Sequence, residues 1–285
     1  MRGFKSLTLR QNMLKNLITI NEFAKLSGVE PSTLRYWDEI GLFSPSRRDA
    51  VNNYRYYTPD QIMAVNFITV LSGLEVPLKD IDRAEAGRTP DSILELMERQ
   101  DELLNLEMRR LQERQAIIHT RQKLINRGKK MAEAADRGEV AVMEMAEMRF
   151  VRGERNEYMN AEGRESFHRL FAKFCKQAEA MRINLGFTVG GVHDDWWSFV
   201  KEPGQPDYFM SVDPAGNQKQ EAGDYLVGLG RGYYGELEDV KERMERYAAK
   251  HGVKTKGMVY TLYLHDEICM KDKEKYLVQV AVKTA

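Results

Sequence analysis

A chain of 285 residues is long enough for two or three domains, and with 42% hydrophobic and 9% aromatic residues it can bury a core. Its 43 Lys and Arg residues balance 43 Asp and Glu residues, so net charge neither indicates nor excludes a nucleic-acid partner. Cys175 and Cys269 form no CxxC pair, which argues against a disulfide framework, structural zinc or an iron–sulfur cluster. Without an apolar run of membrane-spanning length, the sequence predicts a cytoplasmic protein with no membrane partner, metal or other cofactor.

Residues 1–17 have no clear hydrophobic periodicity and are expected to form an arm. Two short helices are predicted next. Thr19 and Glu22 make a capping box at the start of the first helix, where each side chain satisfies a free backbone amide. Gly28 ends this helix, and Gly41 ends the second one. Two short helices joined by a tight glycine turn are typical of a helix-turn-helix motif.

The segment FSPSRRDAVNNYRYYTPDQI predicts a hairpin, or wing, directly after the second helix. Pro45 and the asparagine pair 52–53 mark turns, and residues 54–57 form a short aromatic strand. Thr58 and Gln61 then make a second capping box, which opens a further helix.

The stretch STLRYWDEIGLFSP places three bulky residues side by side near the start of a short helix. Residues at adjacent positions of a helix cannot all face one core, so at least one of them points outward. Arg35 offers a guanidinium fork for a phosphate or a base edge, and Tyr36 offers a hydroxyl for a phosphate. Trp37 can turn inward, and Arg55 of the wing can bind a further phosphate. The alternative for each is a solvated arginine or an aromatic core residue.

From Asp91 to about Asn126 the sequence contains no proline or glycine, which predicts one long amphipathic helix. A single helix cannot bury its apolar stripe alone, so we expect a dimerising coiled coil, with packing against its own chain as the alternative. The helix is expected to end at residues 127–130. The predicted domains are 18–90, 91–130 and 138–285. The apolar row that repeats every seven residues consists of Met97, Leu104, Leu111, Ile118 and Ile125.

The second half of the chain changes in character after a polar linker near Gly138. Six segments read as strands, among them GDYLVGLGRG, GMVYTLYLHDE and KYLVQVAVK. Two longer segments, ESFHRLFAKFCKQAEAM and GELEDVKERMERYAAKHG, read as amphipathic helices. Strands outnumber helices, and their connections suit an antiparallel sheet, so this half is predicted to be an α+β domain.

Residues 18–126 together resemble the MerR family of transcriptional regulators, whose pattern is a helix-turn-helix, an LRYY-like stretch, a YRYY-like wing and a dimerising helix. The resemblance implies a homodimer with an antiparallel coiled coil. It also implies binding to a pseudo-palindromic promoter with an overlong spacer, and activation of RNA polymerase by bending and untwisting of that double-stranded DNA. The candidate DNA-binding residues are Ser32, Thr33, Arg35, Tyr36, Tyr54 and Arg55.

The C-terminal half resembles the GyrI-like effector-binding domain, on the segments DYLVGLGRGYYGELEDVKERMERYAAKHG and GMVYTLYLHDE. That resemblance implies two related βαββ halves that face each other across a cleft, and a small lipophilic aromatic effector. Ring faces can stack on such a ligand and attract cations. The alternative is that many of these aromatic residues belong to the sheet or the core. The candidate ligand-binding residues are Trp196, Tyr208, Tyr225, Thr261, Tyr263 and Tyr276.

Thr261 departs from the family pattern, because the strand reads VYTLY where relatives carry an acid. A hydroxyl cannot neutralise a desolvated cation, so the sequence favours a neutral or weakly charged effector. Asp194, Asp195 and Asp207 are the alternative counter-ions.

Two other classes of function remain open. The run His193-Asp194-Asp195 could belong to a small hydrolase, although a histidine beside two aspartates is also typical of a polar turn. A drug-sequestering resistance protein is the second alternative, and the complete wing motif argues against it.

Overall fold

The computed structural model describes residues 17–158, 163–180 and 183–285. The chain divides between Met108 and Arg109 into two compact units. All but the last residue of the predicted arm 1–17 lies outside the described residues.

The N-terminal unit begins with the predicted pair of helices, α2 (Ile20–Ser27) and α3 (Pro31–Glu39). The capping box that starts α2 is present, since the Glu22 amide donates to Thr19 Oγ1 and the Thr19 amide donates to Glu22 Oε2. Gly28 ends the helix with a left-handed φ of 71°. The local signals therefore produce the helix-turn-helix as expected.

The wing consists of β2 (Arg47–Arg48) and β3 (Arg55–Tyr57), and β3 also pairs with β1 (Ile18–Thr19). Behind it, the rings of Phe23, Phe43 and Tyr57 stack with centroids 4.7 to 5.9 Å apart. This stack and Trp37, which is buried as expected, fix the hairpin to the helices. The remaining elements of this unit are η1 (Pro59–Gln61), α4 (Ile62–Gly73), α5 (Leu78–Ala86) and the start of α6.

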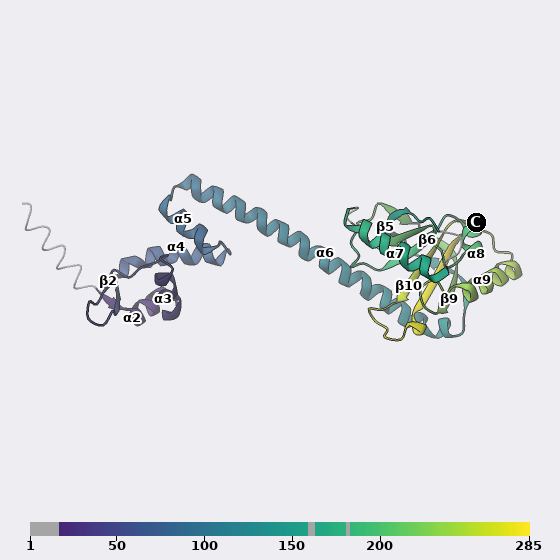
Figure 1. Cartoon of the computed structure of the whole chain (residues 1–285), viewed down its shortest axis with the longest axis horizontal. Coiled ribbons are helices and arrows are strands. Elements are labelled where there is room, and N and C mark those ends of the chain that lie inside the picture. The colour runs from purple at the N-terminus through teal and green to yellow at the C-terminus, as the bar shows by residue number, and fades with distance from the viewer. Residues whose placement is uncertain (1–16, 159–162, 181–182) are drawn as a thin grey trace, which may run out of the picture. The chain divides into compact units, whose positions relative to one another are not determined.

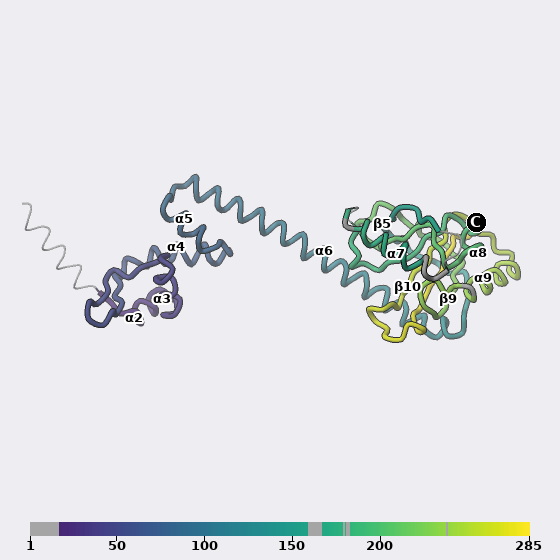
Figure 2. The backbone as a smooth tube through the Cα atoms, viewed as in Figure 1, coloured from purple at the N-terminus to yellow at the C-terminus, as the bar shows by residue number. Residues whose placement is uncertain are grey.

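Helix α6 (Pro90–Asp136) contains 47 residues. Its tube is uninterrupted in Figure 2. The predicted end at residues 127–130 is therefore wrong. Its last turns stay helical because Ala135 is buried in the core of the C-terminal unit and the partly buried Met131 and Ala132 pack against that core. Gly128 does not stop the helix. It makes room for His265, whose ring would lie 2.6 Å from a Cβ at that position.

The C-terminal unit is an eight-stranded antiparallel sheet with helices on its faces, which confirms the predicted α+β class (Figure 1). The strand order is β4-β9-β11-β10-β6-β7-β5-β8. The strands are β4 (Val140–Met145), β5 (Met148–Arg155), β6 (Val189–His193), β7 (Tyr208–Ser211), β8 (Gln218–Gln220), β9 (Gly223–Arg231), β10 (Thr255–His265) and β11 (Leu277–Thr284). The helices are α7 (Gly163–Ala180), α8 (Trp196–Lys201), α9 (Glu238–His251) and the short η2 (Lys273–Lys275).

The element order contains two βαββ units, β5-α7-β6-β7 and β9-α9-β10-β11. Each unit inserts its last strand between its first and second strands, and the two units meet where β6 pairs with β10. This arrangement agrees with the two related halves expected from the sequence. The junction of the halves lies at the centre of the sheet.

Different helices pack against the two faces of the C-terminal sheet. Val278, Val280 and Val282 of β11 pack with Val240 and Met244 of α9. On the other face, strand residues that include Tyr260, Leu262 and Leu264 pack with the C-terminal turns of α6. Because side chains alternate along a strand, each central strand contributes to both layers.

Two structural features are absent from the described residues. None of their helices has both the length and the apolar character that a membrane-spanning segment requires. Within the same ranges, no group of three or more His, Cys, Asp and Glu side chains could hold a metal ion.

Candidate functional site

The first two turns of α3 present a polar surface. Leu34 and Trp37 are buried in the N-terminal core, so the intervening Arg35 and Tyr36 must face outward. Arg35 and Ser32 are exposed, Thr33 is half-buried, and Tyr36 is 51% exposed. A helix that carries a guanidinium and a phenol on one open face can contact phosphates and base edges.

The wing is fixed to α3 by a buried ion cluster. Asp38 follows the exposed pair on the helix, and its side chain is 0% exposed. Arg48 Nη2 donates to both of its carboxylate oxygens at 2.7 Å, and Arg55 Nε donates to Oδ2 at 2.6 Å. Arg48 and Arg55 are opposite each other in the hairpin, so the carboxylate also relieves the repulsion between two like charges.

The structure brings the six predicted DNA-contact residues to α3 and the wing, but their surroundings differ. Tyr54 is 39% exposed beside Tyr56, whereas the side chain of Arg55 is only 19% exposed because it binds Asp38. Sequence reasoning missed the adjacent Arg47 and Arg48 of β2, which are both exposed. The run SRRD before the wing turn was the available signal.

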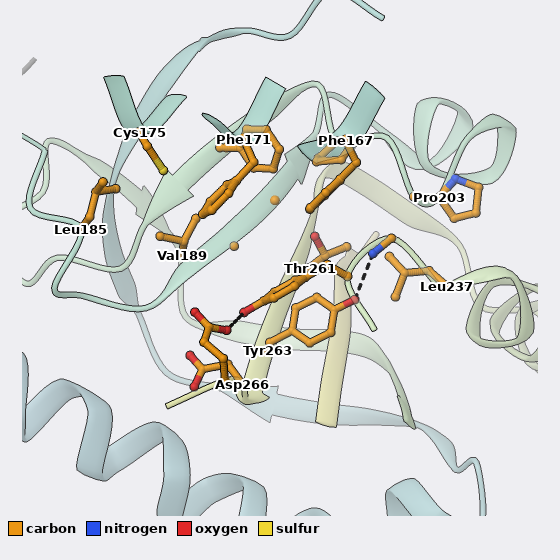
Figure 3. A pocket seen from close by; sticks show the side chains of 18 of the residues that line it. Phe167, Phe171, Cys175, Leu185, Val189, Pro203, Leu237, Thr261, Tyr263 and Asp266 are labelled. Atoms are coloured by element: carbon orange, nitrogen blue, oxygen red, sulfur yellow. Dashed lines mark hydrogen bonds between the residues drawn. The ribbon is translucent and has the colours of Figure 1, made fainter. Parts of the chain in front are cut away.

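A cavity of about 120 Å³ opens where the two halves of the C-terminal sheet meet. Figure 3 shows Phe167 and Phe171 of α7 above it, with Thr261 and Tyr263 of β10 below. Gly191 of β6 lies beside Thr261, where a Cβ would come within 2.6 Å of Thr261 Oγ1. The missing side chain therefore keeps this part of the cavity open.

The cavity walls are mainly aromatic. Phe209 meets Phe167 edge-on at 5.3 Å, and the rings of Tyr234 and Tyr263 lie 4.4 Å apart. Tyr263 donates its hydroxyl to the Tyr233 carbonyl at 2.9 Å. Burial raises the pKa of both Tyr234 and Tyr263, so both phenols stay protonated at neutral pH. Such walls suit a flat, lipophilic molecule.

Two carboxylates and one guanidinium border the same cavity. Arg121 of α6 pairs with Asp266 at 3.1 Å and also donates to the Gly186 carbonyl at 2.7 Å. Glu267 accepts a hydrogen bond from the Tyr234 hydroxyl at 2.5 Å, and among the described residues no cationic side chain pairs with it. The cavity border therefore carries one net negative charge.

Of the predicted ligand-binding residues, Thr261 and Tyr263 line this cavity. Tyr276 lies behind the wall, with its ring 5.6 Å from that of Tyr234. The other three lie elsewhere. Trp196 packs near Phe199, Tyr208 lies under Arg152 at 4.0 Å, and Tyr225 is buried in the core. Sequence reasoning missed the phenylalanines of α7, whose spacing of four residues was the available signal.

The three aspartates considered as counter-ions are used elsewhere. Asp194 and Asp207 both pair with Arg155, at 2.7 and 3.0 Å. Asp195 caps α8 by accepting from the Ser198 amide. His193 is 0% exposed, and burial lowers its pKa to about 4. A substrate cannot reach a side chain that is closed off in this way, which argues against a catalytic role.

Comparisons with known proteins agree with this arrangement. Residues 18–87 match the family model described as MerR HTH family regulatory protein. The multidrug-efflux transporter 2 regulator of Bacillus subtilis is 26% identical over 276 residues, which cover 94% of this chain and 97% of the relative. The chain is a transcriptional regulator with a MerR helix-turn-helix domain. The resemblance predicted from the motifs is thus confirmed for this part of the sequence.

Other matches concern the MerR domain or the fold. The transcriptional regulator BrlR of Pseudomonas aeruginosa is 45% identical over 67 residues, which cover 24% of this chain and 25% of BrlR. A cryo-EM structure of the EcmrR–DNA complex in EcmrR-RPo is 19% identical and covers 94% of this chain and 99% of that one, with a TM-score of 0.38.

Proposed function

We propose that this protein binds double-stranded promoter DNA as a homodimer through its MerR domain, and regulates RNA polymerase there, as an activator, in response to a lipophilic aromatic effector. A cytoplasmic location follows from this role. The observation that supports the effector most directly is the aromatic cavity at the junction of the two sheet halves. The relationship to a regulator of a multidrug-efflux transporter supports the same class of ligand.

The homodimer is supported by the middle of α6. Leu104, Met108, Leu111 and Ile118 lie along it at coiled-coil spacing, and each is more than 40% exposed. Exposed apolar side chains in such a row favour a partner helix. A second copy of α6 offers the same row.

The effector is proposed to carry a positive charge, which revises the expectation of an uncharged molecule. That expectation depended on Thr261 alone. Because Arg121 already neutralises Asp266, Glu267 is left to attract a cation at the border of the cavity. Glu267 is exposed, so we expect at most about 1 kcal/mol from this contact, which is the upper end for ion pairs at a surface.

A fluorescence titration tests the charge of the effector. Quinoline, which is neutral at pH 8, and N-methylquinolinium have the same ring system. We expect the cation to bind several-fold more tightly than quinoline to the wild-type protein. Glu267→Gln should remove this preference without lowering the affinity for quinoline. Equal binding of the two compounds by the wild type would reject the cationic effector.

DNA binding is tested separately, by footprinting of the full chain on the DNA upstream of its own gene. Protection of a pseudo-palindromic site is expected. Protection that requires a dimer, and transcription in vitro that rises when N-methylquinolinium is added, would support the complete proposal. Ligand binding without protection of any DNA would instead favour the sequestering protein.

A further inference from the structure

A second cavity, of about 390 Å³, lies between α6 and the sheet of the C-terminal unit. Its border includes Thr120, Leu124 and Arg127, which share one face of α6 because they are three and four residues apart. From the sheet it includes Leu262 of β10 and Gln279 of β11, which are direct partners in the strand register. Leu262 points away from its neighbours Thr261 and Tyr263, so this cavity and the aromatic cavity lie on opposite faces of β10.

Two polar groups in this cavity are unsatisfied. Gln279 is 2% exposed, and its Oε1 has no hydrogen-bond partner. Arg127 is half-buried, and within the described part of the chain it forms neither a hydrogen bond nor an ion pair. A buried polar group without a hydrogen-bond partner destabilises the folded protein, and a charged group does so more strongly. A ligand that pairs with Arg127 would recover the part of this cost that comes from the guanidinium.

The charge around the cavity is positive. Lys123 lies one turn before Arg127 on α6, whereas Arg149 on the opposite side is already engaged by Glu147 and by the Gly216 carbonyl. Burial without a nearby carboxylate lowers the pKa of Arg127. An arginine fork binds a carboxylate through two parallel hydrogen bonds.

The apolar border differs from that of the aromatic cavity. Met145, Met148, Val212 and Leu262 supply thioether and branched aliphatic surface, and no aromatic ring borders the cavity among the described residues. Methionine side chains adapt their shape to a flexible ligand. An alkyl chain therefore fits this border better than a flat ring system.

We propose that this cavity is a second ligand site, which takes a small aliphatic carboxylate. The carboxylate pairs with Arg127, and its alkyl chain lies along Met145, Met148 and Leu262. The carboxylate accepts hydrogen bonds only, so Gln279 can contribute to binding through its Nε2 and not through Oε1. The site goes beyond the proposed effector function and does not depend on it.

Calorimetric titration of the full chain with octanoate tests the site, with 1-octanol and octyltrimethylammonium as neutral and cationic molecules of the same chain length. Octanoate should bind in a saturable manner and more tightly than either analogue. Arg127→Gln should lower the affinity for octanoate at least tenfold and change the affinity for 1-octanol by less than twofold. Arg114→Gln provides the matched control, because Arg114 is exposed on the same helix and borders neither cavity. It should leave octanoate binding unchanged.

Arg127→Lys and Met148→Trp keep the test decisive if Arg127→Gln does not fold. The lysine keeps the charge but lacks the two parallel donors of the guanidinium, so it should lower the affinity for octanoate several-fold. The tryptophan should fill the cavity and prevent binding of all three probes. Three results would each overturn the proposal: no saturable octanoate binding, equal octanoate binding by the wild type and the Arg127 variants, or equal affinity for octyltrimethylammonium.

Discussion

The ion cluster around Asp38 leads to a quantitative prediction. Asp38→Asn keeps the size of the side chain and one oxygen acceptor but removes the charge that holds both wing arginines. Three hydrogen bonds, from Arg48 and Arg55, end on this carboxylate. After the change, two guanidinium groups on paired strands face each other without a counter-charge.

The magnitude follows from burial. Removing one partner of a buried ion pair costs about 3–5 kcal/mol when the other charge stays trapped. The side chain of Arg48 is 43% exposed and can turn toward water, and the new amide still accepts one hydrogen bond. We therefore expect the free energy of unfolding of the MerR domain to fall by about 2–3 kcal/mol, close to the value of a single charged hydrogen bond.

Urea unfolding measures this loss. Trp37 is the tryptophan of the N-terminal unit, and the other two are Trp196 and Trp197, so changing both of these to Phe leaves fluorescence that reports on the MerR domain. Glu39→Gln is the control, because Glu39 is exposed on the same helix and such changes usually stay within about 0.5 kcal/mol. If Asp38→Asn destabilises the domain no more than Glu39→Gln does, the cluster does not hold the wing.

Three further predictions concern other elements. Arg35→Ala should weaken promoter binding by about 1–3 kcal/mol in a mobility-shift titration, and unchanged affinity of a folded variant would contradict a DNA contact. Leu111→Asp combined with Ile118→Asp should give monomers by light scattering, and a monomeric wild type at micromolar concentration would contradict the coiled coil. Gly128→Ala should lower the free energy of unfolding by about 1 kcal/mol, because the cost of moving His265 exceeds the gain in helix propensity; a stabilised variant would refute the close approach.

The N-terminal unit could be predicted almost completely from the sequence because its signals are local. Thr19, Glu22 and Gly28 set the limits of α2 through contacts within a few residues. The end of α6 could not be predicted in this way. A glycine followed by lysines usually ends a helix, but here burial of Met131 and Ala135 against the sheet outweighs the local preference.

The candidate ligand residues show a similar division. Both Thr261 and Tyr263, which the resemblance pointed to, border the aromatic cavity, because residues two apart on a strand share a face. The same reasoning could not find Arg121, which precedes Asp266 by 145 residues and meets it only in the folded chain. The missed Glu267 is the second residue after β10, but its hydrogen bond depends on Tyr234, which lies in the connection between β9 and α9.

The position of Arg121 has a thermodynamic consequence. Its guanidinium borders the aromatic cavity, while its backbone belongs to the helix that begins at Pro90 in the DNA-binding unit. If the effector changes the affinity of the protein for its promoter, the promoter must change the affinity of the protein for the effector by the same factor. A dissociation constant measured on the free protein then differs from that of the DNA-bound regulator. At the typical coupling of about 1–3 kcal/mol, the two values differ by roughly 5- to 150-fold.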